Sequence, residues 1–187
     1  MEYILRNADF PKDYLEIYKM FVKENKPVFM PQKRNFLNIE DFSHWLSEQL
    51  SGYIHDLYLI ETISETGKWQ ISGYCLSYDY RIYDSHCQIY GYHNHGITAD
   101  MLKHFISILF KEYPLNKIFL QIADIEKTLL SAAIETGFQE EVRLSHSKYI
   151  NGSYHDFIIL GYYAETFFRK MTGDRQTLIY EEQLHQE

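Results

Sequence analysis

Apolar residues recur at helical spacing in four stretches of the chain, which predicts four amphipathic helices. Each stretch also has a residue typical of a helix boundary. Pro11 precedes the first, Asn38 is a candidate N-cap of the second, Pro114 stops the third and Gly137 follows the fourth. The predicted helices lie within residues 11–25, 38–50, 98–113 and 125–136.

Between and around these stretches the pattern becomes extended, with Ile, Tyr and Leu common in short runs. Gly67 predicts a turn that joins two runs into a hairpin, and Asn151-Gly152 predicts a second hairpin near the C-terminus. Together with a short run at the N-terminus, the predicted strands lie within residues 3–7, 56–62, 69–80, 85–93, 116–124, 140–150 and 153–165.

The order of these elements predicts one α/β (α+β) domain over residues 1–187, with a polar, frayed tail from about Thr172. A strand–helix–strand–helix unit in its middle requires a parallel crossover. We therefore expect a mixed, mostly antiparallel sheet of about seven strands, with helices on both faces. The point where such a sheet turns parallel is a natural place for a ligand crevice.

Composition narrows the function classes. The formal net charge of -8 disfavours a nucleic-acid partner, because that binding relies on Lys and Arg, and it is compatible with a cationic substrate. No apolar run approaches the roughly 20 residues that span a bilayer, and because the N-terminus is charged we do not expect a signal peptide there. Cys75 and Cys87 have no metal-binding or disulfide pattern. We expect a cytoplasmic protein with both thiols reduced and with no membrane partner.

The stretch "GYHNHGITAD", residues 91–100, lies between a predicted strand and a strongly amphipathic helix. Three interpretations are open: a cofactor loop, a turn whose His93 and His95 are exposed to solvent, or a metal site formed by these two histidines with His104. No carboxylate or thiolate stands at ligand spacing beside the histidines, so we expect no metal. The position directly before a helix favours an anion-binding loop.

Three further segments complete a pattern that resembles the GCN5-related N-acetyltransferase superfamily, and within it the branch of ribosomal-protein and polyamine acetyltransferases. They are "LRNADFPKDYLEIYKMF" near the N-terminus, "IETGFQEEVRL" at a helix exit, and "YINGSYHDFIILGYYAETF" in the last hairpin. The resemblance covers the chain from Ile4 to about Phe168. It implies a V-shaped splay between the fourth and fifth strands, with acetyl-CoA as co-substrate.

In that superfamily, an Arg or Gln, two residues, a Gly, one residue and a small residue form the loop that holds the pyrophosphate through main-chain amides. His93, Gly96 and Thr98 take these places here, so only Gly96 matches strictly and the usual side-chain brace is missing. The resemblance also places the thioester beside the middle of the fourth strand. The cofactor-binding residues that it implies are Gln88, Ile89, Tyr90, His93, Asn94, His95, Gly96, Ile97, Thr98 and Ala99.

The implied chemistry is direct attack of an amine on the thioester, which needs no nucleophilic cysteine. Three positions depart from the superfamily: Gln121 stands where some relatives have a basic Glu, Ala133 where many have an acidic Tyr, and Glu126 where an Asn is usual. His86 and Glu126 are therefore alternative bases, and Tyr154 an alternative acid. Each also suits a purely structural role.

Acidic and aromatic side chains suit a small cation through Coulomb attraction and cation–π contact. The candidate substrate-binding residues are Phe29, Asp79, Tyr80, Tyr83, Asp84 and Tyr149, although they also fit solvated hairpin tips. Three functions remain open: N-acetyltransferase acting on a polyamine, amino sugar, other small amine or protein N-terminus; a catalytically silent protein that binds CoA or a partner; and an oligomeric or regulatory domain, such as a homodimer, that uses the segment "GYYAETFF".

Overall fold

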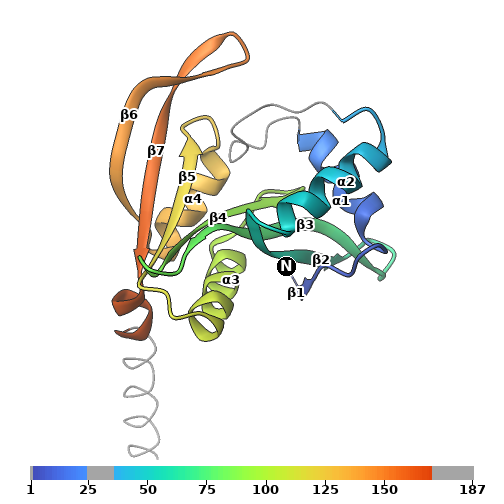
Figure 1. The fold of residues 1–187 in the computed structure, drawn as a ribbon, viewed down its shortest axis with the longest axis horizontal. Coiled ribbons are helices and arrows are strands. Elements are labelled where there is room, and N and C mark those ends of the chain that lie inside the picture. The colour runs from blue at the N-terminus through green and yellow to red at the C-terminus, as the bar shows by residue number, and fades with distance from the viewer. Residues whose placement is uncertain (1, 25–35, 170–187) are drawn as a thin grey trace, which may run out of the picture.

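The computed structural model describes residues 2–24 and 36–169 and forms a single seven-stranded sheet with helices around it (Figure 1). The strands are ordered β1-β2-β3-β4-β5-β7-β6, and residues 164–169 are also helical. The element order matches the prediction. The bounds are β1 Tyr3–Asn7, α1 Tyr14–Glu24, α2 Ile39–Leu50, β2 Ile54–Ile63, β3 Trp69–Arg81, β4 His86–His93, α3 Ala99–Glu112, β5 Lys117–Ala123, α4 Lys127–Thr136, β6 Gln139–Ile150 and β7 Ser153–Tyr163.

The sheet is antiparallel except where β4 meets β5. Helix α3 connects these two strands, as a parallel crossover requires. Their pairing covers only His86–Ile89 on β4 and Lys117–Leu120 on β5, so the two strands diverge after Ile89. The splay implied between the fourth and fifth strands is therefore confirmed.

Helices cover both faces of the sheet, as predicted. Tyr74 of β3 stacks on Phe21 of α1, with ring centroids 5.0 Å apart. The next residue, Cys75, faces the other way, and its partner Tyr58 on β2 contacts Phe105 of α3 at 5.7 Å. One face thus packs against α1 and α2, and the other against α3, which in turn contacts α4.

Local signals fix the ends of the elements. Asn38 accepts a hydrogen bond from the Asp41 amide at 2.9 Å and begins α2. Gly137, with φ +114°, ends α4 in the left-handed conformation. Asn151 and Gly152, with φ +50° and +85°, form the turn between β6 and β7. These three predictions are confirmed.

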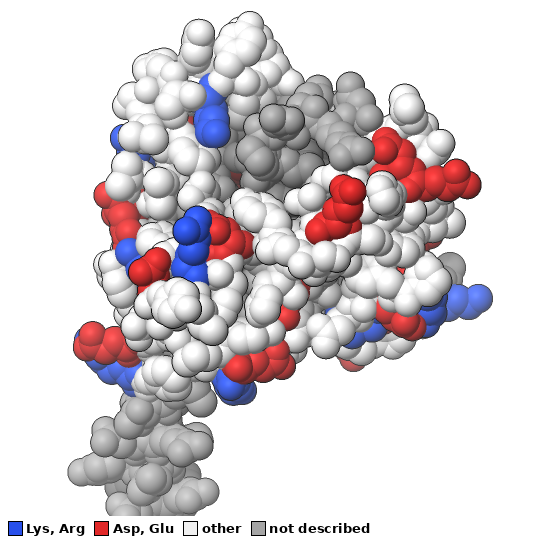
Figure 2. Space-filling view, viewed as in Figure 1, with Lys and Arg blue, Asp and Glu red and all other residues white. Residues whose placement is uncertain are grey.

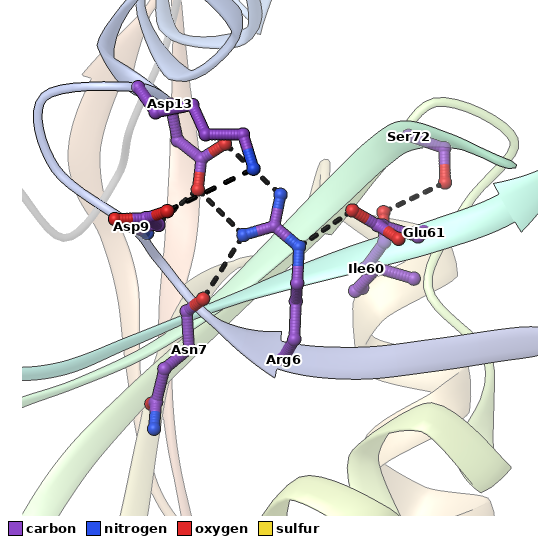
Figure 3. A network of polar contacts seen from close by, with 8 residues as sticks. Arg6, Asn7, Asp9, Asp13, Ile60, Glu61 and Ser72 are labelled. Carbon is purple, nitrogen blue, oxygen red and sulfur yellow. Dashed lines mark hydrogen bonds and ion pairs between the residues drawn. The ribbon is translucent and has the colours of Figure 1, made fainter.

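Arg6, in the first of the quoted segments, joins three elements near the N-terminus. Its guanidinium donates to both carboxylate oxygens of Asp13, at 2.6 and 3.0 Å, and its Nε donates to Glu61 at 2.6 Å (Figure 3). The Asp9 amide donates to Asp13 as well, at 2.7 Å. The network joins β1, the entry to α1 and β2, and it lowers the pKa of Asp13 chiefly through the hydrogen bonds from Arg6.

Phe29 and the tail from about Thr172 lie outside the described residues. In the described part of the chain, none of the helices combines the length and apolar character that a membrane crossing needs. Beyond the end of β5, the β6–β7 hairpin continues toward its turn and projects from the body of the molecule (Figure 1).

Candidate functional site

A cavity of about 420 Å³ opens where β4 and β5 diverge. Its walls come from the second half of β4, the loop after it, the start of α4 and the end of β6. A volume of a few hundred Å³ is typical of small-molecule sites. The lining residues are Tyr90, Gly91, Tyr92, His93, Gly96, Ile97, Ile125, Glu126, Lys127, Thr128, Leu129 and Ile150.

A second cavity, of about 460 Å³, adjoins the first and lies between the N-terminal part of α3 and α4. Ile97, Lys127 and Thr128 line both cavities, so the two form one continuous surface. An elongated ligand can therefore reach from the notch between the strands to the start of α3.

The N-terminus of α3 offers main-chain donors to this surface. Thr98 is its N-cap, and its hydroxyl accepts from the Met101 amide at 3.3 Å. The amides of Ile97, Thr98, Ala99 and Asp100 have no hydrogen-bond partner among the described residues. Unpaired amides and the helix dipole together favour an anion at this position.

Part of the expected cofactor loop is bonded internally. The Gly96 amide donates to the His93 carbonyl at 2.9 Å, and the Asn94 amide donates to the Ser72 carbonyl at 2.9 Å. These two amides are therefore unavailable to a ligand. The donors that remain for an anion begin at Ile97, one residue after the glycine that matches the motif.

His93 is buried at 4% exposure, in contrast to the alternative of a solvent-exposed loop residue. Nδ1 of His93 donates to the Gly96 carbonyl at 3.1 Å, since a carbonyl oxygen only accepts, and Nε2 then accepts from the Ser72 hydroxyl at 3.1 Å. Burial lowers the pKa of His93, which keeps the ring neutral. The imidazole therefore braces the loop that the motif comparison left without a brace.

Gly96 allows the loop to pass close to α4. Its φ is +89°, and an added Cβ would lie 2.5 Å from Cγ2 of Thr128. No larger residue fits at this distance without movement of the loop or of the helix. The contact sets the separation of the two walls that line both cavities.

Glu126 spans the mouth of the splay. One carboxylate oxygen accepts from the Tyr90 hydroxyl at 3.0 Å, and the other accepts from the Ala123 amide at 3.1 Å. The side chain thus joins β4 to the end of β5, where α4 begins. Both oxygens already hold a structural bond, so its suggested part in accepting a proton from an amine stays a prediction.

The other two suggested acid–base residues lie on β4 and β7. His86 is at the start of β4, where its ring contacts Phe119 at 5.3 Å, and the cavity begins four residues later at Tyr90. Tyr154 is 65% exposed near the tip of the β6–β7 hairpin, and its ring contacts Tyr149 at 5.1 Å. Neither lines the cavities.

The structure does not bring the suggested substrate residues together. Tyr83 is 99% exposed in the β3–β4 turn beside Asp84, and Tyr80 stacks on His55 at 5.0 Å. Asp79, close to that turn, accepts hydrogen bonds from Arg81 and Gln88. Tyr149 lies near the tip of the other hairpin.

The two hairpin ends are far apart along the sheet. The start of β4, next to Tyr83, pairs with Lys117, which pairs with Tyr163, nine residues along β7 from Tyr154. At about 3.3 Å per residue this separation is roughly 30 Å.

The metal alternative finds no support in the arrangement of its histidines. The rings of His93 and His95 have centroids 5.8 Å apart, whereas His104 contacts Tyr3 at 5.9 Å. Within residues 2–24 and 36–169, His, Cys, Asp and Glu form no group of three or more that could hold a metal ion. Both cysteines are buried in strands, and burial raises their thiol pKa values, to about 12 for Cys87.

Sequence reasoning missed the contribution of α4. Lys127 and Thr128 line both cavities, and Ile125 and Ile150 add apolar walls to the first. Lys127 is exposed, and its ammonium has no ion-pair partner in the described part of the chain. A basic residue in the first turn of the helix after the fifth strand was the available signal.

Charge over the rest of the surface is mixed. On the face drawn in Figure 2, Lys and Arg side chains stand singly among Asp and Glu, and they form no continuous basic patch. This distribution agrees with the overall charge of -8 and gives that face no footprint for a nucleic-acid backbone.

The splayed mixed sheet, the loop before α3 and the crossover helix together define the fold of the GCN5-related N-acetyltransferases. Among solved structures, the chain is similar to spermidine N-acetyltransferase from Vibrio cholerae in complex with CoA and spermine, with 15% identity and a TM-score of 0.72 over 89% of this chain and 98% of that one. It is also similar to RimL, a ribosomal L7/L12 alpha-N-protein acetyltransferase in complex with CoA, with 14% identity and a TM-score of 0.68 over 86% and 93%. No family model and no curated protein matches the sequence.

Proposed function

We propose that the protein is an N-acetyltransferase that transfers the acetyl group of acetyl-CoA to a primary amine. The observation that carries the proposal is the continuous surface from the β4–β5 notch to the open amides of α3. A diphosphate at the helix start would leave the pantetheine arm and thioester to enter the notch. Both similar structures named above contain CoA, which agrees with this use of the fold.

Three features of the chain would hold the diphosphate. The amides of Ile97 to Asp100 donate hydrogen bonds to its oxygens, and the α3 dipole favours its charge. His93 keeps the loop in shape from inside the protein. Lys127 supplies the one cationic side chain among the described residues that line the two cavities.

The acceptor is a primary amine of the class that includes polyamines, amino sugars, other small amines and protein N-termini. The amine attacks the thioester carbonyl directly, and the carbonyl lies near the point where β4 leaves β5. An acidic protein attracts cationic acceptors, in agreement with the net charge of -8. A spermidine acetyltransferase and a protein N-terminal acetyltransferase are both among the similar folds, so the acceptor is assigned only by class.

The test is a thermal shift followed by an assay of thiol release. Acetyl-CoA at a hundred times its dissociation constant stabilises the folded state by about 2.7 kcal/mol, so the midpoint rises by several degrees. A panel of amines then identifies the acceptor by CoA thiol release. Absence of a shift at millimolar acetyl-CoA would reject the proposal.

A second candidate function is a silent protein that binds CoA without turnover. Gln121 and Ala133 favour it, because neither residue type can exchange a proton as the usual Glu and Tyr do. A thermal shift without thiol release for any amine of the panel would support this second function over the first.

Lys127→Ala tests the placement of the diphosphate. Loss of one phosphate–ammonium contact weakens acetyl-CoA binding about five- to twentyfold at low salt, and the difference shrinks at 0.5 M salt. Isothermal titration measures both affinities. Lys111→Ala, in the last turn of α3, is the matched control and leaves the affinity unchanged. Equal affinities for Lys127→Ala and the parent protein would place the phosphates elsewhere.

A further inference from the structure

Asp124, His155 and Ser153 form a hydrogen-bonded chain outside the residues discussed so far. Nδ1 of His155 lies 2.9 Å from Oδ1 of Asp124, and Nε2 lies 2.8 Å from Oγ of Ser153. A carboxylate accepts but cannot donate, so Nδ1 carries the proton and Nε2 has the lone pair. This tautomer and orientation suit an imidazole that accepts a proton through Nε2.

The chain lies at the mouth of the notch. Asp124 directly precedes Ile125 and Glu126, which line the cavity on one side. Ser153 pairs with Ile150, which lines it on the β6 side. The side chain of His155 is 19% exposed and that of Asp124 is 40% exposed, so a ligand can approach both.

His155 also faces the correct side of the sheet. Side chains two apart on a strand share a face, so His155 lies on the face of Phe157, whose partner on β5 is Ala123. Gln121 and Phe119 of β5 share that face with Ala123, and Phe119 meets His86 of β4 on it. Tyr90 lies four residues after His86 on β4 and therefore on the same face. Its ring centroid is 6.4 Å from that of Tyr74, and Tyr74 stacks on Phe21 of α1. His155 is thus on the α1 side, as is the position where some relatives have a basic Glu.

We propose that His155 is the general base that deprotonates the acceptor ammonium, and that Asp124 is the residue that positions it. The inference rests on the proposed acetyltransferase function. The proton is then removed by a residue of β7 and not by the residue at the Gln121 position of β5. Strand β7 supplies the imidazole, and the turn between β5 and α4 supplies the carboxylate that orients it.

Ser153 has a second acceptor that makes room for the amine. Its hydroxyl lies 3.3 Å from the Ile150 carbonyl as well as 2.8 Å from Nε2 of His155. When the hydroxyl turns to the carbonyl, Nε2 becomes available to an incoming ammonium. The orientation of the Ser153 hydroxyl therefore decides whether the Nε2 lone pair is accessible, and Ser153 is not the nucleophile.

The proton balance is complete without a further reagent. The ammonium gives one proton to Nε2 of His155, and the neutral amine attacks the thioester carbonyl. The C–N bond forms, the C–S bond breaks, and the nitrogen loses a second proton to the CoA thiolate. His155 then releases its proton to solvent, so the net products are the amide, CoA thiol and one proton. The charged groups that face the imidazole are Asp124 and, across the strand pair, Lys148, whose ammonium lies over the Phe157 ring.

The test compares His155→Gln with the parent protein, with an acceptor found in the amine panel. We expect kcat/KM to fall about 10²- to 10⁴-fold at pH 7, while the acetyl-CoA affinity and the thermal midpoint stay unchanged. His44→Gln, at an exposed position of α2, is the matched control and retains full activity. Asp124→Asn lowers kcat/KM by at least about tenfold, since an amide can hold the wrong tautomer.

A pH profile separates a base from a merely structural histidine. Without a base, the variant reacts only with the fraction of amine that is already deprotonated in solution. Its kcat/KM therefore rises about tenfold per pH unit toward the amine pKa of about 10. The parent protein reaches a plateau well below that pH.

Four outcomes overturn the inference. A parallel loss of kcat/KM at every pH assigns His155 a structural role. Full activity of His155→Gln places the base elsewhere and leaves the acetyltransferase proposal intact. An acetylated Ser153 detected by mass spectrometry after incubation with acetyl-CoA alone replaces direct attack with a covalent route. No thiol release by the parent protein overturns both this inference and the proposed function.

Discussion

Gly96→Ala tests whether the contact between the loop and α4 shapes the candidate cofactor site. The substitution has two separate costs. The first is the backbone conformation, since φ is +89° and an L side chain at such an angle costs about 1–2 kcal/mol. The second is steric, because the new Cβ would lie 2.5 Å from Cγ2 of Thr128. Overpacking of this kind costs about 1–3 kcal/mol when the neighbours cannot move.

Two other glycines separate these costs. Gly67 and Gly152 have φ of +76° and +85°, and nothing lies within 4 Å of a Cβ added at either position. Substitution by Ala at either site therefore lowers stability only through the backbone conformation, by about 1–2 kcal/mol. Thr128→Ser provides the complementary relief, because it removes the Cγ2 methyl group and keeps the hydroxyl.

Urea unfolding and acetyl-CoA titration give the comparison. We expect Gly96→Ala to lose at least about 1 kcal/mol more stability than Gly152→Ala, or to bind acetyl-CoA about tenfold more weakly if the loop yields instead. The double variant Gly96→Ala/Thr128→Ser recovers about 1 kcal/mol or more of that loss. If Gly96→Ala and Gly152→Ala agree in both measurements, the loop is not held against Thr128 and the reasoning is refuted.

Two further predictions concern charges near the helix starts. Asp100→Asn removes a carboxylate from the first turn of α3, so we expect the acetyl-CoA affinity to rise about two- to fivefold at low salt. The same change lowers the free energy of unfolding by about 0.3–1 kcal/mol, because a negative charge at a helix start is stabilising. If titration shows no gain in affinity, the phosphates lie away from this turn. Asp13→Asn breaks the network with Arg6 and lowers the free energy of unfolding by about 2–4 kcal/mol, measured with urea. The loss is smaller than for a fully buried ion pair, because the Arg6 side chain is 29% exposed. Asp9→Asn, which changes an exposed carboxylate, is the control and costs at most about 0.5 kcal/mol. The folded-state pKa of Asp13 is lowered, so its contribution is present above the unfolded pKa of about 3.9 and is lost as pH falls below it; a stability profile of equal slope below pH 4 in Asp13→Asn and the parent protein would contradict this.

Local chemistry explains why the element order could be predicted. The cap at Asn38, the left-handed Gly137 and the Asn151-Gly152 turn each act within a few residues, so they are visible in the sequence. The extent of the β4–β5 pairing is different. It depends on contacts between segments that α3 separates, and sequence alone gave the splay only through resemblance.

Composition could not locate the acceptor site for a related reason. Tyr83 and Tyr149 have the chemistry expected of a wall for a cation, yet they belong to hairpins at opposite ends of the strands. Residue type indicates what a side chain can bind, whereas position in the sheet decides which side chains can bind together. The residues that do meet at the notch, such as Ile125 and Ile150, are apolar and carry no sequence signal of their own.

The departures from the acetyltransferase pattern have a common physical explanation. A motif based on residue type counts His93 as a missing brace, but an imidazole with bonds on both nitrogens can hold a loop as a guanidinium or amide does. In the same way, Gln121 removes a carboxylate from β5, while Asp124 and His155 place an oriented imidazole one strand away on the same face. In the proposed reaction the loop must hold its shape and the amine must lose a proton, and different residues can meet each requirement. Because Gln stands at the usual base position, we expect turnover to depend on His155 of β7. Gln121→Glu should therefore not restore turnover to the His155→Gln variant, and restored turnover would show that the two positions reach the same proton.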